Sequence, residues 1–485
     1  MSIHFKADIL SGAYLVFNTL LTLFLLTIGN GYLFVSFFIV GGHVRDFINV
    51  VYQMFNIHKI LRRLPEVDGD EANTICCLVP VHNEHPSMLK QNLDGLTTQK
   101  LPRHTTVIIL LLFDGIGDHN SDLFSSTDML IDEADDRLYD ELFYENWKTR
   151  RDTRLVYKIG SYNGTTVVLA MKDTNGGKKD SLIVGERLIA EFPNIKYAGL
   201  PQVDYIYHTD GDTVSDTNCL GEMLKSLVHD KELDAVSGLL RAYAKDGATW
   251  MEQCFVMMQD FQYFFSLIVR RSTESLMSAT TCLPGCANMV RVSDKTERAI
   301  DKYRKLPIDG GNLLQAVTRM QGTDRRYTTL MLRQGAKLRM NWRAFVHTEP
   351  PLNAQSFINQ RRRWSSNSFF NSIVLLYSAN IPPYVRASTL VDIGRVFSTL
   401  FRFISYFCFW FYIDDLSVTN VAFMLVCIVV PYAYAFAWVL CIVPERRGMV
   451  AGFLLNRTVM PFLTVVAVTK MYFTSTNFAW GRTTS

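Results

Sequence analysis

The sequence lacks the features of a nucleic-acid-binding protein or a disulfide-stabilised protein. Its 485 residues carry a formal net charge of only +3, so the composition does not point to nucleic acid. The nine cysteines are scattered and odd in number, which favours reduced thiols facing cytosol or lipid over a disulfide framework. Cys282 and Cys286 have no second Cys/His pair nearby, so a zinc site is not expected. The sequence also has no internal repeat.

Charged side chains are absent from residues 9–42, which exceeds the roughly 20 residues that a helix needs to cross a bilayer. No cleavage site of small residues follows a short apolar core, so we predict a membrane anchor over residues 1–44 rather than a removable signal. One long tilted helix is expected here, although Gly29-Asn30-Gly31 could bend it into a tight hairpin. The basic linker over residues 45–65 then predicts that the chain emerges on the cytoplasmic side.

Residues 66–350 alternate short apolar runs with segments of helical character. The apolar runs cover residues 75–81, 107–113, 155–159 and 205–207, and the helical segments cover residues 182–191 and 220–229. This alternation indicates an α/β domain with a mainly parallel sheet and helices on both faces. Ligands bind at the carboxyl ends of the strands in such sheets.

The C-terminal part is strongly apolar. Residues 351–392 are expected to form amphipathic interfacial helices. Residues 393–473 hold two candidate membrane spans, 397–413 and 418–443, which are separated by acidic residues. Residues 474–485 form a tail.

The last apolar segment, residues 449–473, has an unusual composition for a membrane span. It contains Arg457, Pro461 and Lys470. A mid-segment arginine costs a few kcal/mol in a lipid-facing helix. We therefore expect this segment to be interfacial or re-entrant.

A cationic run ending in an indole, Gln360–Trp364, precedes the C-terminal spans. Its three guanidiniums can neutralise a diphosphate in a fixed bidentate geometry. Trp364 offers a flat apolar face that suits a sugar ring. Alternatively, the run is a juxtamembrane basic cluster that holds orientation or touches anionic lipid.

Carboxylates follow two of the predicted strands. Glu84 closes the segment Val79–Glu84, and Asp114 lies in Phe113–Gly115. A carboxylate at a strand end can accept hydrogen bonds from a nucleobase imide or a ribose. Each acid alone also fits an ordinary turn, but at two successive strand ends they indicate a nucleotide pocket.

The pair Asp210 and Asp212 follows a third predicted strand. Two carboxylates at this spacing can face a hard divalent cation that bridges phosphate oxygens, although Asp-x-Asp is common by chance. The glycines and lysines of Gly176–Asp180 precede a predicted helix and can approach an anion, or they form a solvated loop.

Asp324 opens a predicted helix that runs through Leu332. An acid at this position caps a helix, or it serves as a general base within reach of an acceptor hydroxyl. Neighbouring arginines would keep it ionised. The turn Thr281–Ala287, which contains Pro-Gly, leaves room for a ligand or has no chemical role.

Taken in order, these residues resemble chitin synthases, which belong to the processive inverting glycosyltransferases together with hyaluronan and cellulose synthases. The matching elements are Val79–Glu84, Phe113–Gly115, Thr209–Thr213, Leu283–Cys286, Thr323–Arg325, Gln360–Trp364 and Trp480–Thr483. The three consecutive arginines, the Leu-Pro-Gly and the terminal Trp-Gly look more like chitin synthases than hyaluronan synthases.

The resemblance implies a cytoplasmic GT-A domain with a Rossmann-like mixed sheet, attached to a helical multi-pass region in the plasma membrane. It implies UDP-N-acetylglucosamine as donor, Mg²⁺ or Mn²⁺ as cofactor, and a nascent chitin oligomer and membrane lipid as partners, with a homodimer left open. By position, the donor-binding residues would be Pro80, His82, Glu84, Asp114, Lys178, Asp210, Asp212, Gln360, Arg361, Arg363 and Arg482.

The other roles follow from the same resemblance. Asp212, with Asp210, would hold the metal, and Asp324 would be the catalytic base. The acceptor-binding residues would be Pro284, Gly285, Cys286, Asp324 and Trp364, and the switch loop would be Trp480, Gly481 and Arg482. Two positions depart from the family pattern: Thr323 stands where a glutamate is usual, and Arg482 comes one residue earlier than the usual cation.

Three other functions fit parts of the sequence. The first is a synthase for hyaluronan or another polysaccharide. The second is a phosphoaspartyl phosphatase, because Asp210–Val214 fits its Asp-x-Asp-x-Thr/Val start. The third is a channel or receptor with an inert nucleotide-binding domain. The phosphatase would leave the basic run and both membrane regions unexplained.

Overall fold

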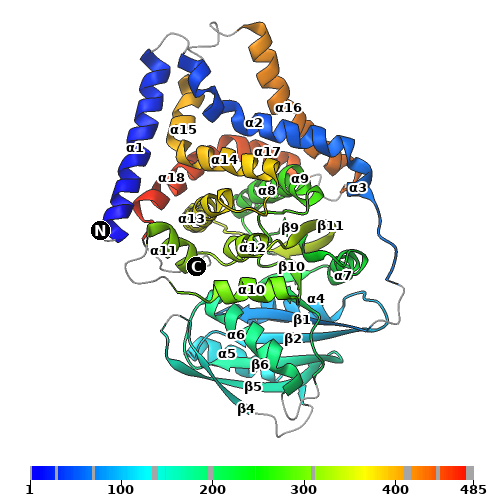
Figure 1. Ribbon diagram of the computed structural model, residues 1–485. Helices are drawn as coiled ribbons and strands as arrows, with labels where there is room; N and C mark the ends of the chain where they lie inside the picture. The colour runs from blue at the N-terminus through cyan, green and yellow to red at the C-terminus, as the bar shows by residue number, and fades with distance from the viewer. Residues whose placement is uncertain are drawn as a thin grey trace.

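A computed structural model describes residues 3–27, 31–67, 72–133, 140–147, 149–194, 200–245, 247–306, 312–408, 417–443 and 448–476. A sheet with its covering helices occupies one end of the molecule and a helical region the other (Figure 1). Helices α12 (Asp324–Arg333) and α13 (Ala354–Leu376) lie between them.

Eleven strands in the described part of the chain form one sheet. Its order is β3-β5-β6-β2-β1-β7-β10-β9-β11-β8, and β4 pairs with β5. The strands are β1 Asn73–Val81, β2 Thr105–Phe113, β3 Asp132–Glu133, β4 Asp140–Glu145, β5 Asp152–Tyr162, β6 Thr165–Lys172, β7 Tyr205–His208, β8 Thr213–Ser215, β9 Leu233–Ala242, β10 Asn288–Arg291 and β11 Lys337–Thr348.

The sheet is mixed. Strand β1 is parallel to β2 and β7, β2 to β6, and β9 to β11, whereas the other pairings are antiparallel. The expectation of a mainly parallel sheet is therefore wrong, and the Rossmann-like mixed sheet is confirmed. One reason is the β5–β6 hairpin, where Asn163 and Gly164 adopt φ of 51° and 76° as a tight hairpin turn requires.

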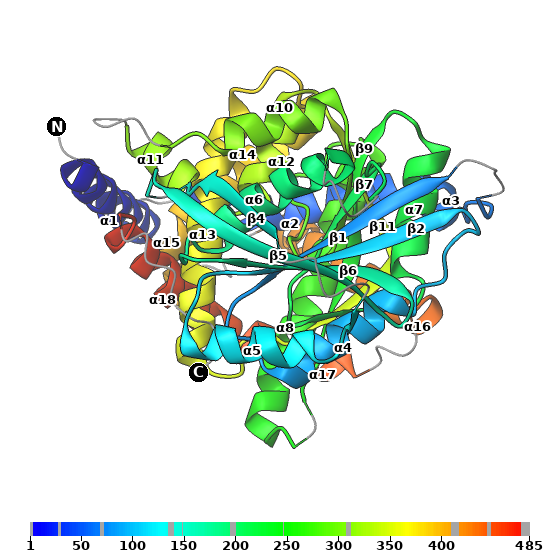
Figure 2. The same ribbon diagram turned by 90° about the horizontal axis from the view of Figure 1, so that it is seen from below.

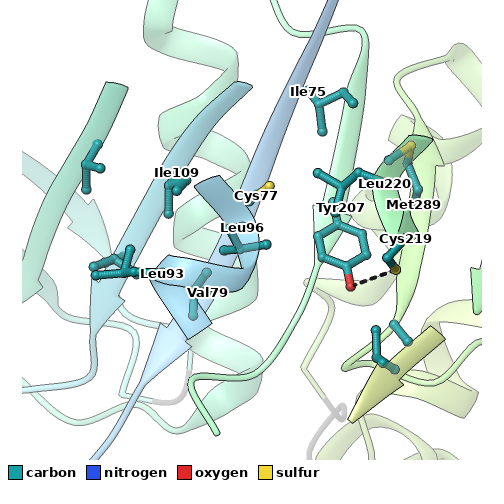
Figure 3. Packing of buried hydrophobic residues seen from close by; sticks show 14 of the residues in the cluster. Ile75, Cys77, Val79, Leu93, Leu96, Ile109, Tyr207, Cys219, Leu220 and Met289 are labelled. Atoms are coloured by element: carbon teal, nitrogen blue, oxygen red, sulfur yellow. Dashed lines mark hydrogen bonds between the residues drawn. The ribbon is translucent and has the colours of Figure 1, made fainter. Parts of the chain in front are cut away.

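Helices cover both faces of the sheet, because alternate side chains of the central strands point to opposite sides. Figure 3 shows Ile75, Cys77 and Val79 of β1 on the face that packs against α4 (Pro86–Thr97) and α7 (Cys219–His229). Cys76 and Leu78 point the other way, toward α6 (Lys178–Glu191). Figure 2 shows α4 and α5 (Asp118–Asp128) on the side of the sheet opposite α6. Continuous burial explains why β1 reads as an uninterrupted apolar run.

Two helical groups lead from the sheet toward the helical region. The first is α8 (Trp250–Phe265), a π-helical segment (Ser266–Arg271) and α9 (Ser272–Leu276). The second is α10 (Asp294–Tyr303), α11 (Leu313–Met320) and α12. The predicted helices at 182–191, 220–229 and 324–332 are confirmed, with α6 beginning earlier than expected, at Lys178.

The N-terminal region contains two helices rather than one. Helix α1 covers Ile3–Thr27 and α2 covers Gly31–Phe55, followed by the short α3 (Ile57–Leu61). The expectation of one long helix is therefore wrong, and the alternative of a break near Gly29-Asn30-Gly31 agrees with the ends of α1 and α2. Residues 28–30 themselves lie outside the described residues.

The C-terminal helices are α14 (Pro383–Phe397), α15 (Thr399–Cys408), α16 (Val418–Cys441), α17 (Met449–Thr458) and α18 (Met460–Phe473). Helices α1 and α16 are long and apolar enough to cross a membrane, and α17 and α18 meet at 55° as a broken span or re-entrant pair. The bend agrees with the prediction for residues 449–473. The predicted span 397–413 is interrupted between α14 and α15, and its end lies outside the described residues.

Buried ion pairs join α2 to both parts of the molecule. Asp46 accepts hydrogen bonds from Arg270 of the π-helical segment, at 3.0 Å from Nε and 2.9 Å from Nη2. Arg45 pairs with Asp392 of α14. Helix α2 is thereby fixed to the sheet domain and to the C-terminal helices at adjacent residues.

Candidate functional site

Two acidic loops meet at the carboxyl ends of β1 and β7, because these strands are parallel neighbours. The Glu84 side chain accepts a hydrogen bond from the His82 backbone N–H and lies against Gly211. Asn92 of α4 holds the other loop by donating to the carbonyl oxygens of Asp210 (3.1 Å) and Thr213 (2.6 Å). Pro80 belongs to β1 itself. The structure thus brings Glu84 close to the Asp210–Asp212 pair.

Glu84, Asp210 and Asp212 place three carboxyl groups close together at this edge of the sheet. Burial, and then Asp212, raises the pKa of Glu84 to about 7. Burial, and then Asp210, raises the pKa of Asp212 to about 6 against the opposing effect of Lys178. Close carboxylates that resist ionisation are stabilised by a nearby cation.

These residues fit a divalent cation that is shared with a substrate. Among the described residues, no group of three His, Cys, Asp or Glu side chains forms a complete metal cage. Mg²⁺ is commonly held by one or two carboxylates together with substrate phosphates. Asp212, with Asp210 beside it, supplies such a pair of hard oxygen ligands.

Asp114 lies in a closed network at the end of β2. Its side chain is buried, and Oδ1 forms an ion pair with Lys172 Nζ (2.5 Å) and accepts a hydrogen bond from the Gly176 backbone N–H (3.0 Å). Lys172 also pairs with Asp180 at 2.8 Å. Asn120 links the Asp114 carbonyl oxygen to the His82 ring. Asp114 therefore fixes the end of β2 to the first turn of α6, and Lys172 is a participant that sequence reasoning missed.

The first turn of α6 connects this network to the acidic loops. Lys178 Nζ donates to Asp210 Oδ1. Burial lowers the pKa of Lys178, but Asp210 and then Asp324 outweigh burial and raise it. Lys178 is thus a fixed cation between Asp210 and Asp324.

Asp324 begins α12 and is enclosed by the Leu-Pro-Gly turn and its own neighbour. A Cβ atom at Gly285 would lie 2.4 Å from Asp324 Oδ1, so the glycine packs directly on the carboxylate. Thr323 donates its hydroxyl to the same oxygen. Asn288 holds the turn by donating to the Pro284 carbonyl oxygen at 2.7 Å. Thr323, at the position that departs from the family pattern, therefore contacts the candidate base directly.

Cys286 lies within the same cluster. Burial raises the pKa of its thiol, and Asp210 adds to the effect while Lys178 opposes it. The turn that holds Gly285 thus also places a small side chain beside the acidic loops.

The predicted basic run is part of α13, whose Arg361 sits among three aromatic rings. Its guanidinium carbon lies 4.4 Å from the Trp364 ring centroid, 4.8 Å from that of Phe357 and 5.6 Å from that of Tyr263. Arg361 Nε and Nη2 and Gln360 Oε1 are buried without a hydrogen-bond partner among the described residues. The two unpaired donors of Arg361 suit an anionic ligand, whereas Gln360 Oε1 is an unpaired acceptor.

Trp364 is 43% exposed, and its ring lies 6.0 Å from that of Tyr263. Burial raises the pKa of Tyr263, with Arg361 lowering it and Cys286 raising it, so this tyrosine lies between the two motifs. Tyr263 is a second participant that sequence reasoning missed, because a tyrosine in an apolar helix carries no distinguishing signal.

Helix α13 packs on the loop that precedes Asp324. The Asn367 side chain lies against Gly322, and Ser366 donates to Gln321. Further along the run, burial and then Arg362 lower the pKa of Arg363 to about 10. The predicted switch-loop residues Trp480, Gly481 and Arg482 lie outside the described residues.

Similarity to known proteins extends over most of the chain. The chitin synthase family model matches residues 187–485. The chain is 23% identical over 450 residues to chitin synthase 8 of Gibberella zeae, covering 85% of this chain and 67% of the relative. It is 22% identical over 367 residues to chitin synthase 8 of Verticillium dahliae, covering 65% of this chain and 59% of the relative.

Among solved structures, the chain is similar to a mannosyltransferase from Pyrobaculum calidifontis in complex with GDP-Man and Mn²⁺, with a TM-score of 0.48 and 13% identity over 87% of this chain and 98% of that one.

The family match covers more than half of the chain and includes the acidic pair, the candidate base and the basic run. The chain therefore belongs to the chitin synthase family of glycosyltransferases.

Proposed function

We propose that this protein is a membrane-embedded processive chitin synthase. It transfers N-acetylglucosamine from UDP-N-acetylglucosamine to the non-reducing-end 4-hydroxyl of a growing β-1,4 chain. The observation that carries the proposal is the position of Asp324 beside the Lys178–Asp210 pair, under Gly285. The candidate base that would act on the acceptor and the charged groups that would bind the leaving group then lie in one site.

In the proposed reaction, Asp324 takes the proton of the acceptor hydroxyl. The acceptor oxygen forms a bond to C1 of the donor sugar while the bond from C1 to the UDP oxygen breaks, which inverts the anomeric centre. Lys178 and the arginines of α13 bind the UDP leaving group. Charges positioned in this way are often the largest catalytic contribution.

The donor is proposed to lie over the strand ends. Glu84 and Asp114 contact the uridine, and Asp210 and Asp212 hold Mg²⁺ or Mn²⁺. The cation, when bound, neutralises negative charge on the diphosphate.

Trp364 is proposed to stack beneath the acceptor sugar and to keep the product bound between transfers. Its exposed face and its place on α13, between the sheet domain and the helical region, support this role. Helices of the N- and C-terminal regions would then line an exit path across the plasma membrane, with the catalytic domain in the cytoplasm.

The test of the base is Asp324→Asn. We expect it to lower the transfer rate by about 100- to 10,000-fold, the usual contribution of a general base, while UDP binding persists. Asp294→Asn is the matched control, because Asp294 is an exposed acid in α10. Polymer synthesis at the wild-type rate by the Asp324→Asn variant would refute the assignment.

A product assay tests the polymer. We expect chitinase to digest the polymer and hyaluronidase to leave it intact. The reverse result would assign the chain to hyaluronan synthesis instead.

A further inference from the structure

A basic pocket lies at the turn that follows α10, and its lining residues differ from those of the acidic loops. It is lined by Arg150, Arg304, Lys305, Leu306 and Arg319 and has a volume of about 580 Å³. Four of these five described lining residues are cationic. They come from the turn between β4 and β5, the end of α10 and the helix α11. Side chains of one charge from three separate elements meet here.

Hydrogen bonds fix the walls of this pocket. Arg319 donates from Nη1 to the Leu306 carbonyl oxygen. Trp147 donates from its indole N–H to the Arg304 carbonyl oxygen at 2.8 Å, which ties the β4–β5 turn to α10. Lys179 donates to the Arg319 carbonyl oxygen at 2.7 Å, which ties α6 to α11. The pocket is therefore preformed, and a ligand would not have to order its walls.

The positive charge in the pocket is only weakly compensated. Arg150 pairs with Glu145 at 3.0 Å, and Arg304 with Asp301 at 3.6 Å. These pairs are solvent-exposed, and exposed ion pairs are weak enough to exchange for a ligand. Arg304 Nε is buried without a hydrogen-bond partner among the described residues.

The amine of Lys179 lies behind the wall of the pocket. Lys179 Nζ is 3.9 Å from the Trp147 ring centroid and 4.4 Å from that of Tyr303. Burial lowers the pKa of Lys179, and the positive charges of Arg326 and Arg319 lower it further. Burial is the main reason that protonation of Lys179 is resisted, and an anion in the pocket would relieve the smaller part that comes from the two arginines.

We propose that this pocket binds a small phosphate-bearing anion at a site separate from the donor site. Arginine forks match phosphate oxygens bidentately, and three of the lining residues are arginines. Four cations suit a ligand with two or more negative charges. The proposal stands independently of the enzymatic reaction, because it rests on a different set of side chains.

The test is calorimetric titration of the full-length purified protein with inorganic pyrophosphate. Saturating UDP and excess Mg²⁺ are present throughout, so that the candidate donor site is occupied. The test variant combines Arg304→Gln with Lys305→Gln. It removes two positive charges and leaves the backbone carbonyl that accepts from Trp147. The matched control combines Arg298→Gln with Lys302→Gln, which removes the same charge from an exposed part of α10.

We expect wild type and control to bind pyrophosphate with equal affinity and the test variant to bind at least about tenfold more weakly, since a hydrogen bond to a charged group is lost. Thermal unfolding confirms that both variants fold. Absence of pyrophosphate binding by the wild type, or equal weakening in both variants, would overturn the proposal.

Discussion

The close contact between Gly285 and Asp324 gives a quantitative prediction for Gly285→Ala. The new Cβ would lie 2.4 Å from Asp324 Oδ1, 2.9 Å from Cγ and 3.3 Å from Oδ2, whereas an ordinary contact is at least 3.4 Å. The carboxylate must therefore move by about 1 Å, and a misplacement of this size in a reacting group costs about 100-fold in rate. That factor corresponds to about 2.7 kcal/mol of activation free energy.

The assay is the initial rate of UDP release by purified protein, with UDP affinity and thermal unfolding measured on the same samples. We expect kcat to fall about 100-fold while UDP affinity and stability change little, because the acidic loops are not displaced. Gly117→Ala is the matched control, since its Cβ would meet nothing within 4 Å and its φ of −155° is an extended conformation. An unchanged kcat, or an equal loss of UDP affinity, would show that Gly285 does not position the base.

Three further predictions concern the same site. Thr323→Val should lower kcat and shift its pH profile by removing a hydrogen bond to Asp324, whereas Thr323→Ser should retain both; identical profiles for the two variants would contradict this. Without metal, the free energy of unfolding should decrease as the pH rises from about 4 to about 7. The reason is that Glu84 and Asp212, with folded pKa values of about 7 and 6, keep protons in the folded state that the unfolded chain releases near pH 4.5 and 3.8. Above about pH 7, added Mg²⁺ should restore the lost stability, as measured by thermal unfolding. A stability that does not change with pH would argue against an acidic cluster. Trp364→Ala should shorten the polymer measured by gel filtration more than it slows UDP release, and unchanged chain length would remove this residue from the acceptor path.

The parts of the fold that could be read from the sequence have strong local signals. β1 and β2 are buried on both faces and therefore appear as continuous apolar runs. Helix α12 begins at Asp324, where an acid favours a helix start. The basic run lies on one helix, α13, within the residues expected to form amphipathic helices.

Other parts depend on contacts that no local pattern records. The β5–β6 hairpin was missed although Asn163-Gly164 is a typical hairpin turn, because the flanking runs also fit parallel strands. Lys172 is fully buried between Asp114 and Asp180, whereas lysines are usually exposed. The contact of Gly285 with Asp324 joins segments that only the tertiary fold brings together.

The ion pairs of α2 set the order in which the protein can be assembled. Asp46 pairs with Arg270, which lies 224 residues later in the chain, and Arg45 with Asp392, which lies 347 residues later. During synthesis Arg45 and Asp46 emerge together and can pair with each other, whereas Arg270 and Asp392 arrive later. The packing of α2 on the sheet domain and on α14 is therefore complete only after the chain has been made as far as Asp392.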